Sequence, residues 1–172
     1  MKNFLSLLLA FAFVHGACLV SGQSTAVPGQ VEVARHGDSV IAGTMDHKPV
    51  RVVLSTYELE IGTAHPSPMD RRTNCLYTKR PCSQVSNISI WVGGKRLFVP
   101  RSAFADCTDL GAMWLTSQSD AYVLYLGGGD GAEAYTVKIY FNAGGIGRRE
   151  MYDGETKKLL QTTTYMPPPV IE

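Results

Sequence analysis

The sequence predicts an all-β fold, either an antiparallel sandwich or a small barrel with a C-terminal meander. Between residues 31 and 165, short apolar or alternating runs recur, separated by turn residues such as Gly, Pro and Asn. No stretch in this region shows the 3.6-residue periodicity of an amphipathic helix. The chain of 172 residues is 45% hydrophobic and 18% charged, which excludes a disordered protein and supports one core. Strand order is not encoded in the pattern, so sandwich and barrel both stay open.

The first 22 residues have the pattern of a secretory signal peptide. Lys2 supplies the positive charge, and residues 4–14 form an uninterrupted apolar run that is too short to span a bilayer as a helix. We expect cleavage after Gly22, with lipid attachment at Cys18 or an uncleaved anchor as alternatives. The mature protein is then expected in a periplasm or outside the cell, and no later apolar run is long enough to span a membrane.

The first half of the mature chain predicts three strands and one long loop. Residues 23–30 are small and polar, and are typical of a flexible leader. We expect strands at residues 31–34, 39–42 and 50–61, the last with the alternation of a strand that has one face in water. Residues 62–81 contain prolines and a charge cluster, and predict the longest loop.

A β-hairpin is the clearest local signal in the chain. Residues 88–92 and 95–99 alternate on either side of Gly93-Gly94, a pair suited to a tight turn that needs positive φ. Pro100 ends the second strand because proline has no N–H to donate. Residues 102–106 predict one short helical turn with Ser102 as its N-cap, and residues 113–116 another short strand.

The C-terminal third predicts a meander of four strands. These are expected at residues 121–126, 134–141, 148–152 and 158–165, with glycine-containing turns between the first three and after the third. The GGGDG stretch at 127–131 is followed by a strand instead of a helix, which favours a turn over a phosphate-binding loop. Residues 166–172 are proline-rich and predict an extended tail, so one β domain is expected at 31–165.

Three cysteines remain after signal cleavage. Cys75 and Cys82 are close in sequence with Pro81 between them, and we predict a disulfide that closes this short loop. Pairing of Cys82 with Cys107 is the alternative. Cys107 is expected to be the odd cysteine, buried as a small hydrophobe beneath Phe104 and Ala105 rather than redox-active, since no CxxC motif is present.

No pattern in the sequence indicates a cofactor, a metal or a known catalytic centre. No serine lies in a GxSxG or SxxK motif, so a hydrolase has little support. The acidic residues near turns do not have the spacing of a calcium loop. The three mature histidines, His36, His47 and His65, lack ligand spacing, so we interpret them as scattered surface residues and keep a metal site as the alternative.

Short basic pairs are the main candidates for a binding surface. The candidate binding residues are His65, Arg71, Arg72, Lys79, Arg80, Lys95 and Arg96, from the long loop and the hairpin. Solvated charges that protect strand edges are the simpler explanation. Tyr122 and Tyr140 are further candidates for outward aromatics, although core or cross-strand packing fits them better.

The stretches ISIWVGGKRLFVPRSAFAD, at 88–106, and YVLYLGGGDGAEAYTVKIYFNAGGIGRRE, at 122–150, resemble small exported bacterial β-rich proteins of unknown function. The resemblance covers about the second half of the chain. It implies an all-β exported domain, and it implies no activity, cofactor or catalytic residue.

The interpretation that these observations favour is an exported binding module that contacts a protein or another macromolecule without catalysis. Residues 62–82 and the hairpin tip at 93–96 are the expected contact. The mature chain has fifteen basic and fifteen acidic residues, because Lys2 is lost with the signal, and this balance argues against nucleic acid as the partner. A periplasmic carrier of a small ligand or metal is the alternative, and a cell-envelope hydrolase is a weaker one.

Overall fold

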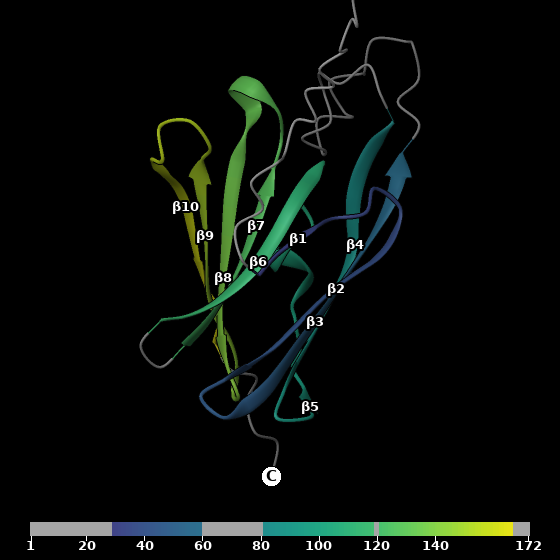
Figure 1. The fold of residues 1–172 in the computed structure, drawn as a ribbon. Helices are drawn as coiled ribbons and strands as arrows, with labels where there is room; N and C mark the ends of the chain where they lie inside the picture. The colour runs from purple at the N-terminus through teal and green to yellow at the C-terminus, as the bar shows by residue number, and fades with distance from the viewer. Residues whose placement is uncertain (1–28, 60–80, 119–120, 167–172) are drawn as a thin grey trace, which may run out of the picture.

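The computed structural model describes residues 29–59, 81–118 and 121–166, which form a sandwich of two antiparallel sheets (Figure 1). This confirms the all-β prediction, and the two separate sheets decide for a sandwich over a barrel. Ten strands and two 3-10 turns are present in these residues. In the same described segments, no helix is long and apolar enough to cross a membrane.

Six strands form the larger sheet, in the order β1-β6-β7-β8-β9-β10. Their bounds are β1 Gln30–Glu32, β6 Leu110–Gln118, β7 Ala121–Gly128, β8 Tyr135–Asn142, β9 Gly145–Asp153 and β10 Leu159–Thr164. From β6 to β10 each strand pairs with the next, which confirms the predicted meander. The sixth strand, β1, comes from the start of the described chain and pairs with β6 through Gln30 and Trp114.

Four strands form the smaller sheet, in the order β2-β3-β4-β5. Their bounds are β2 Gly37–Met45, β3 Lys48–Leu59, β4 Cys82–Val92 and β5 Lys95–Arg96. The turn between β4 and β5 has positive φ at Gly93 and Gly94, as the sequence predicted. The second strand of this hairpin, Lys95–Arg96, is shorter than the predicted 95–99, although the Leu97 amide still donates to the Ile90 carbonyl at 2.9 Å and the Leu97 side chain is buried.

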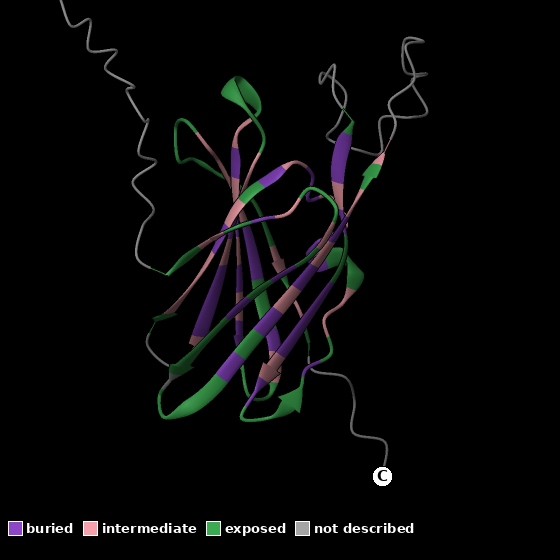
Figure 2. Cartoon of the chain, turned by 45° about the vertical axis from the view of Figure 1, so that its right-hand side comes forward, coloured by how far each residue is buried: buried purple, intermediate pink, exposed green. Residues whose placement is uncertain are grey.

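The core lies between the two sheets, and alternating residues of both fill it (Figure 2). Val50, Val52 and Leu54 of β3 face Leu124, Ile139 and other apolar side chains of the larger sheet in one buried cluster. The side chains at the alternate positions of each strand point away from this core. The two outer faces of the sandwich therefore carry the outward residues of each strand.

The connection from β5 to β6 differs from its prediction. A 3-10 turn, η2, covers Arg101–Ala103, and Pro100 occupies the N-cap position without a side-chain hydrogen bond. Ser102 therefore lies inside the turn, so the prediction that it caps a helical turn at 102–106 is wrong. Pro100 fixes the entry φ and leaves the cap position without a hydroxyl.

Candidate functional site

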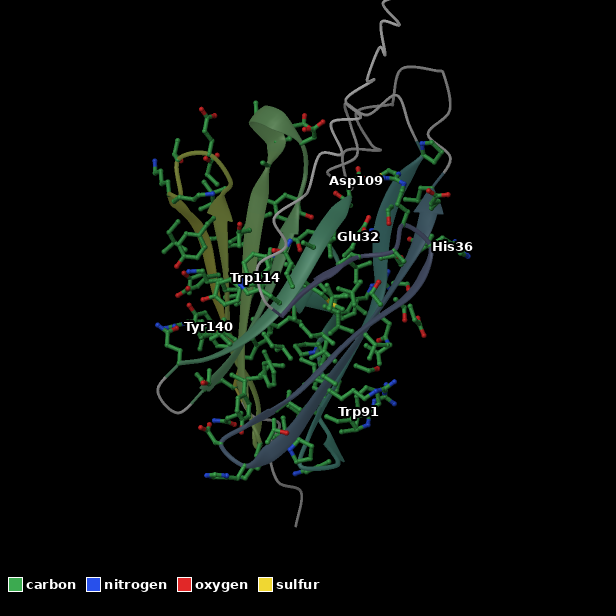
Figure 3. All side chains as sticks on the ribbon, viewed as in Figure 1. Glu32, His36, Trp91, Asp109, Trp114 and Tyr140 are labelled. Atoms are coloured by element: carbon green, nitrogen blue, oxygen red, sulfur yellow. The ribbon has the colours of Figure 1, made fainter. Side chains whose placement is uncertain are left out.

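The outer face of the larger sheet carries a set of aromatic and charged side chains that we call the aromatic band. Its members come from β6, β7, β8 and β9: Trp114, Tyr125, Lys138, Tyr140, Arg148, Glu150 and Tyr152. Strand alternation places them opposite the core-facing residues, and direct register joins Trp114 to Tyr125, Tyr125 to Lys138 and Lys138 to Glu150. Figure 3 shows Trp114 and Tyr140 on this side of the molecule.

The rings and the lysine of the aromatic band stack across neighbouring strands. The ring centroids of Trp114 and Tyr125 are 4.9 Å apart with an interplanar angle of 12°. The ammonium of Lys138 lies 5.4 Å from the Tyr125 centroid and 4.3 Å from the Tyr152 centroid. These distances suit offset stacking and cation–π attraction, so one lysine ties rings of two strands together.

Glu150 is the hydrogen-bond acceptor at the centre of the other half of the band. One of its carboxylate oxygens accepts hydrogen bonds from the phenols of Tyr140 and Tyr152, each at 2.8 Å. The other oxygen lies 3.2 Å from Nε of Arg148, whose guanidinium is 4.1 Å from the Tyr140 ring centroid. This half of the band is held together by charge-assisted bonds.

The hydrogen bonds of Glu150 shift the ionisation of the groups around it. Burial by itself raises the pKa of Glu150, but the two phenol hydrogen bonds and the charges of Arg148 and Lys138 outweigh it and lower that pKa below its ordinary value. Donation to the carboxylate raises the pKa of Tyr152 to about 12. At neutral pH the site therefore holds a fixed anion between two neutral phenols.

The outer face of the smaller sheet carries a different cluster, which we call the arginine clamp. It consists of Arg51 in β3, Trp91 in β4 and Arg96 in β5, placed side by side by direct cross-strand register. The guanidinium carbons of Arg51 and Arg96 lie 5.1 Å and 5.7 Å from the Trp91 ring centroid. Figure 3 shows Trp91 on the smaller sheet, on the side away from Tyr140.

The arginine clamp continues into a polar row along β4. Ser89 accepts hydrogen bonds at 3.0 Å from Arg96 and from the amide of Asn87. Neither Arg51 nor Arg96 pairs with a carboxylate of the described residues, whose ion pairs involve Arg35, Arg148 and Arg149. The positive charge of the clamp is therefore not neutralised within this part of the chain.

A buried arginine joins the β5–β6 connection to the larger sheet. Arg149 of β9 is 1% exposed and donates to Ala103 O at 3.1 Å and to both carboxylate oxygens of Asp106, at 2.7 and 2.8 Å. Cys107 beside it is a free, fully buried thiol, and burial together with the Asp106 charge raises its pKa to about 12. A thiol in this state is a poor nucleophile, as the sequence led us to expect.

Arg35 anchors the strand ends from which the segment 60–80 departs and to which it returns. Its Nε lies 3.0 Å from Glu58 of β3, a second guanidinium nitrogen lies 3.4 Å from Asp109, and a third donates to the carbonyl of Pro81. Asp109 in turn accepts from the Ser83 amide at 3.0 Å. The network ties the end of β3 to the start of β4.

Of the predicted binding residues, only Lys95 and Arg96 are described, and both are exposed in β5. His65, Arg71, Arg72, Lys79 and Arg80 lie outside the described residues, so their convergence stays a prediction. Cys75 also lies outside them, and the Cys75–Cys82 disulfide stays a prediction as well. The alternative pairing of Cys82 with Cys107 is not formed, because Cys107 is free.

The histidines that the structure describes do not form a site together. His36 immediately precedes β2 and His47 follows it in the β2–β3 turn, so the whole length of β2 separates them, roughly 30 Å of extended chain. Within the described segments, no three His, Cys, Asp or Glu side chains are grouped to hold a metal. His65 lies outside these segments.

The two tyrosines singled out in the sequence have opposite positions. Tyr122 is buried and packs on Phe141 with ring centroids 5.5 Å apart, which confirms the core packing favoured for it and excludes the outward alternative. Tyr140 belongs to the aromatic band. Arg51 and Trp91 were not among the residues predicted from the sequence, although both occupy outward positions in alternating runs. Only the register shows that they are neighbours.

Comparisons of the chain with protein-family models, with curated proteins and with solved structures found no match to it. The resemblance to exported bacterial β-rich proteins therefore stays a prediction.

Proposed function

We propose that this protein is an exported, non-catalytic binding module, periplasmic or secreted, that contacts a protein partner through the aromatic band. The observation that supports this most directly is that the side chains of the band hold one another in place across four strands. Tyrosine, tryptophan and arginine are the residues that contribute most binding energy in protein interfaces. Residues 62–82 are retained as a second expected contact.

Pre-organisation is the physical reason why such a surface suits binding. Side chains that are already fixed lose little conformational entropy when a partner covers them, so more of the interaction free energy appears as affinity. Val123 illustrates how tightly this face is packed. It points outward with Tyr125 and is not part of the core cluster, yet it is fully buried between its cross-strand neighbours Thr116 and Tyr140.

The electrostatics of the band also favour binding over acid–base chemistry. A general acid or base works best when its pKa lies near the operating pH. The pKa of Glu150 is lowered and that of Tyr152 is raised, which moves both away from neutrality. The carboxylate is thereby suited to holding the rings of Tyr140 and Tyr152 in fixed positions on the surface.

The test is capture of exported proteins from the source organism with the wild-type chain and with two variants, Tyr125→Ala and Lys138→Ala. Each variant should weaken capture of a genuine partner at least tenfold, because each removes a stacked member of the band. Lys48→Ala is the matched control, since Lys48 is an exposed lysine of the other sheet. It should capture as the wild type does.

A second readout uses the fact that the chain has two tryptophans. In a Trp91→Phe variant, Trp114 of the band is the sole tryptophan of the chain, and the purified partner should change its emission. A partner captured equally by Tyr125→Ala and Lys138→Ala, or one that leaves Trp114 emission unchanged, would refute the assignment of the band.

A further inference from the structure

The arginine clamp has a geometry that the aromatic band lacks: two cations on either side of one aromatic residue, neither of them paired with a carboxylate of the described residues. Arg51 and Arg96 lie on the strands to either side of the strand that carries Trp91. Two strand spacings separate their backbones by about 9.6 Å. The distances from the indole centroid to the two guanidinium carbons, 5.1 and 5.7 Å, agree with cations that flank the ring.

Cation–π contact with the indole holds the guanidinium groups without using up their hydrogen-bond donors. A guanidinium carries five N–H groups in its plane, and contact of its face with an aromatic ring leaves these free to donate. Arg96 uses one nitrogen on Ser89, whereas Arg51 has no hydrogen bond or ion pair within the described part of the chain. The clamp therefore offers two sets of oriented donors to an anion.

We propose that the arginine clamp is a binding site for an acidic polysaccharide, with one acidic group of the polymer on Arg51 and another on Arg96. A small anion with a single charged group can occupy one side of Trp91 only. A polymer with repeated acidic groups engages both guanidinium groups in one binding event, which raises its apparent affinity. This proposal concerns the face opposite the aromatic band and does not depend on it.

The polar residues of β4 beside the arginine clamp favour a sugar polymer over other polyanions as its ligand. Asn87 is exposed, and its amide donates to Ser89, while its carbonyl oxygen has no partner within the described residues and is available to a ligand hydroxyl. The face thus combines cations, an indole and an amide, which match the acidic groups, the apolar C–H face and the hydroxyls of a sugar. Nucleic acid is disfavoured because the mature chain has no excess of basic residues.

The experiment uses the signal-free chain with Trp114→Phe, in which Trp91 is the sole tryptophan. It is titrated at low salt with two probes, polygalacturonate for carboxylate groups and dextran sulfate for sulfate groups. A change in Trp91 emission with either probe is the expected result, and the stronger probe identifies the acidic group. Affinity electrophoresis in gels containing the same polymer gives a readout that is independent of fluorescence.

Substitutions then test both halves of the clamp. Arg51→Gln and Arg96→Gln should each weaken binding at least tenfold, and Arg51→Lys should restore only part of it, because lysine keeps the charge and loses the planar stacked donors. Lys158→Gln is the matched control for charge, since Lys158 is exposed near β10 of the other sheet, and it should bind as the wild type does. Circular dichroism and the thermal midpoint check that each variant is folded.

Four outcomes would overturn the proposal. They are no response to either acidic polymer, an equal response to uncharged dextran or to poly-glutamate, monomeric galacturonate binding as tightly as the polymer, and unchanged binding by both Arg→Gln variants. Binding should also fall steeply between low and physiological salt, because exposed charge pairs are screened. None of these outcomes bears on the aromatic band, whose reporter is Trp114.

Discussion

Arg148 and Arg149 are adjacent in β9 but have opposite environments. The side chain of Arg148 is 48% exposed on the aromatic band, whereas that of Arg149 is 1% exposed between the sheets. Strand alternation explains the opposite directions, and the ion pair with Asp106 together with the Ala103 carbonyl explains how a charge is tolerated inside. The same residue type therefore has different energetic consequences at successive positions.

This contrast gives a prediction for the free energy of unfolding. Arg149→Met should lower it by about 1–3 kcal/mol, because it removes the donor to the buried Ala103 carbonyl and the bidentate bond to Asp106, whose side chain is 41% exposed. Arg148→Met should change it by less than about 1 kcal/mol, as is usual for exposed pairs. Urea unfolding of both variants measures the difference. Equal losses in the two variants would contradict the assigned role of Arg149.

Glu150 gives a prediction for the pH dependence of stability. Because its pKa is lower in the folded than in the unfolded chain, its contribution is fully present above the unfolded value of about 4.3 and is lost as pH falls through the folded value. The stability difference between the wild type and Glu150→Gln should be constant from pH 7 to about 5. Urea unfolding at pH 7, 5 and 3 should show that this stability difference is smaller at pH 3 than at pH 5 and 7. A difference unchanged at pH 3 would show that the pKa of Glu150 is not lowered.

At the scale of elements, the turn between β7 and β8 shows why its glycines are needed. Gly129 has φ 73°, and a Cβ there would lie 2.2 Å from the carbonyl oxygen of Glu133. Gly131 has φ 53°, but a Cβ there would meet no atom within 4 Å. Both glycines have a left-handed backbone conformation, which residues with a Cβ rarely adopt. At Gly129 there is, in addition, no room for a Cβ.

The two glycines form a matched pair for substitution. Gly131→Ala should cost roughly 1–2 kcal/mol of unfolding free energy from backbone strain alone. Gly129→Ala should cost clearly more, because the steric contact with the Glu133 carbonyl must also be relieved. Thermal or chemical denaturation compares them directly. If Gly131→Ala were the more damaging of the two, the close approach at Gly129 would not be a constraint.

Elements with a strong local signal were predicted well, and elements set by distant contacts were not. The Gly93-Gly94 hairpin and the meander were expected because alternation and turn glycines act over a few residues. The prediction missed the early start of β4 at Cys82, which is fixed by pairing with Leu59 of β3. It also placed Gln30, the first residue of β1, in a flexible leader, because its partner Trp114 is distant in sequence.

At the scale of the whole molecule, Cys107 reports on opening of the sandwich. Its thiol is fully buried and its pKa is raised to about 12, so almost no thiolate is exposed while the protein is folded. Iodoacetamide should therefore label native Cys107 at a rate that follows global unfolding. Mass spectrometry of samples pulsed with and without urea measures this rate. Rapid labelling of the native protein would contradict the burial.

The same labelling, carried to completion, tests the predicted disulfide. In the unfolded, unreduced mature chain, a Cys75–Cys82 bond leaves one reactive thiol, and reduction should raise the number to three. Three labelled thiols before reduction would rule the bond out. Peptide mapping then shows whether the single label is on Cys107.

The sequence by itself determined that the chain is β-rich, where its hairpins turn and that Cys107 is the odd, buried cysteine. These properties follow from alternation, turn residues and composition, which act locally or on average. Only the tertiary structure decided that two sheets pack as a sandwich, that Arg149 is inside, and that the aromatic band and the arginine clamp exist on opposite faces. Both surfaces are made by cross-strand neighbours such as Arg51 and Trp91, which the register brings together from distant parts of the chain.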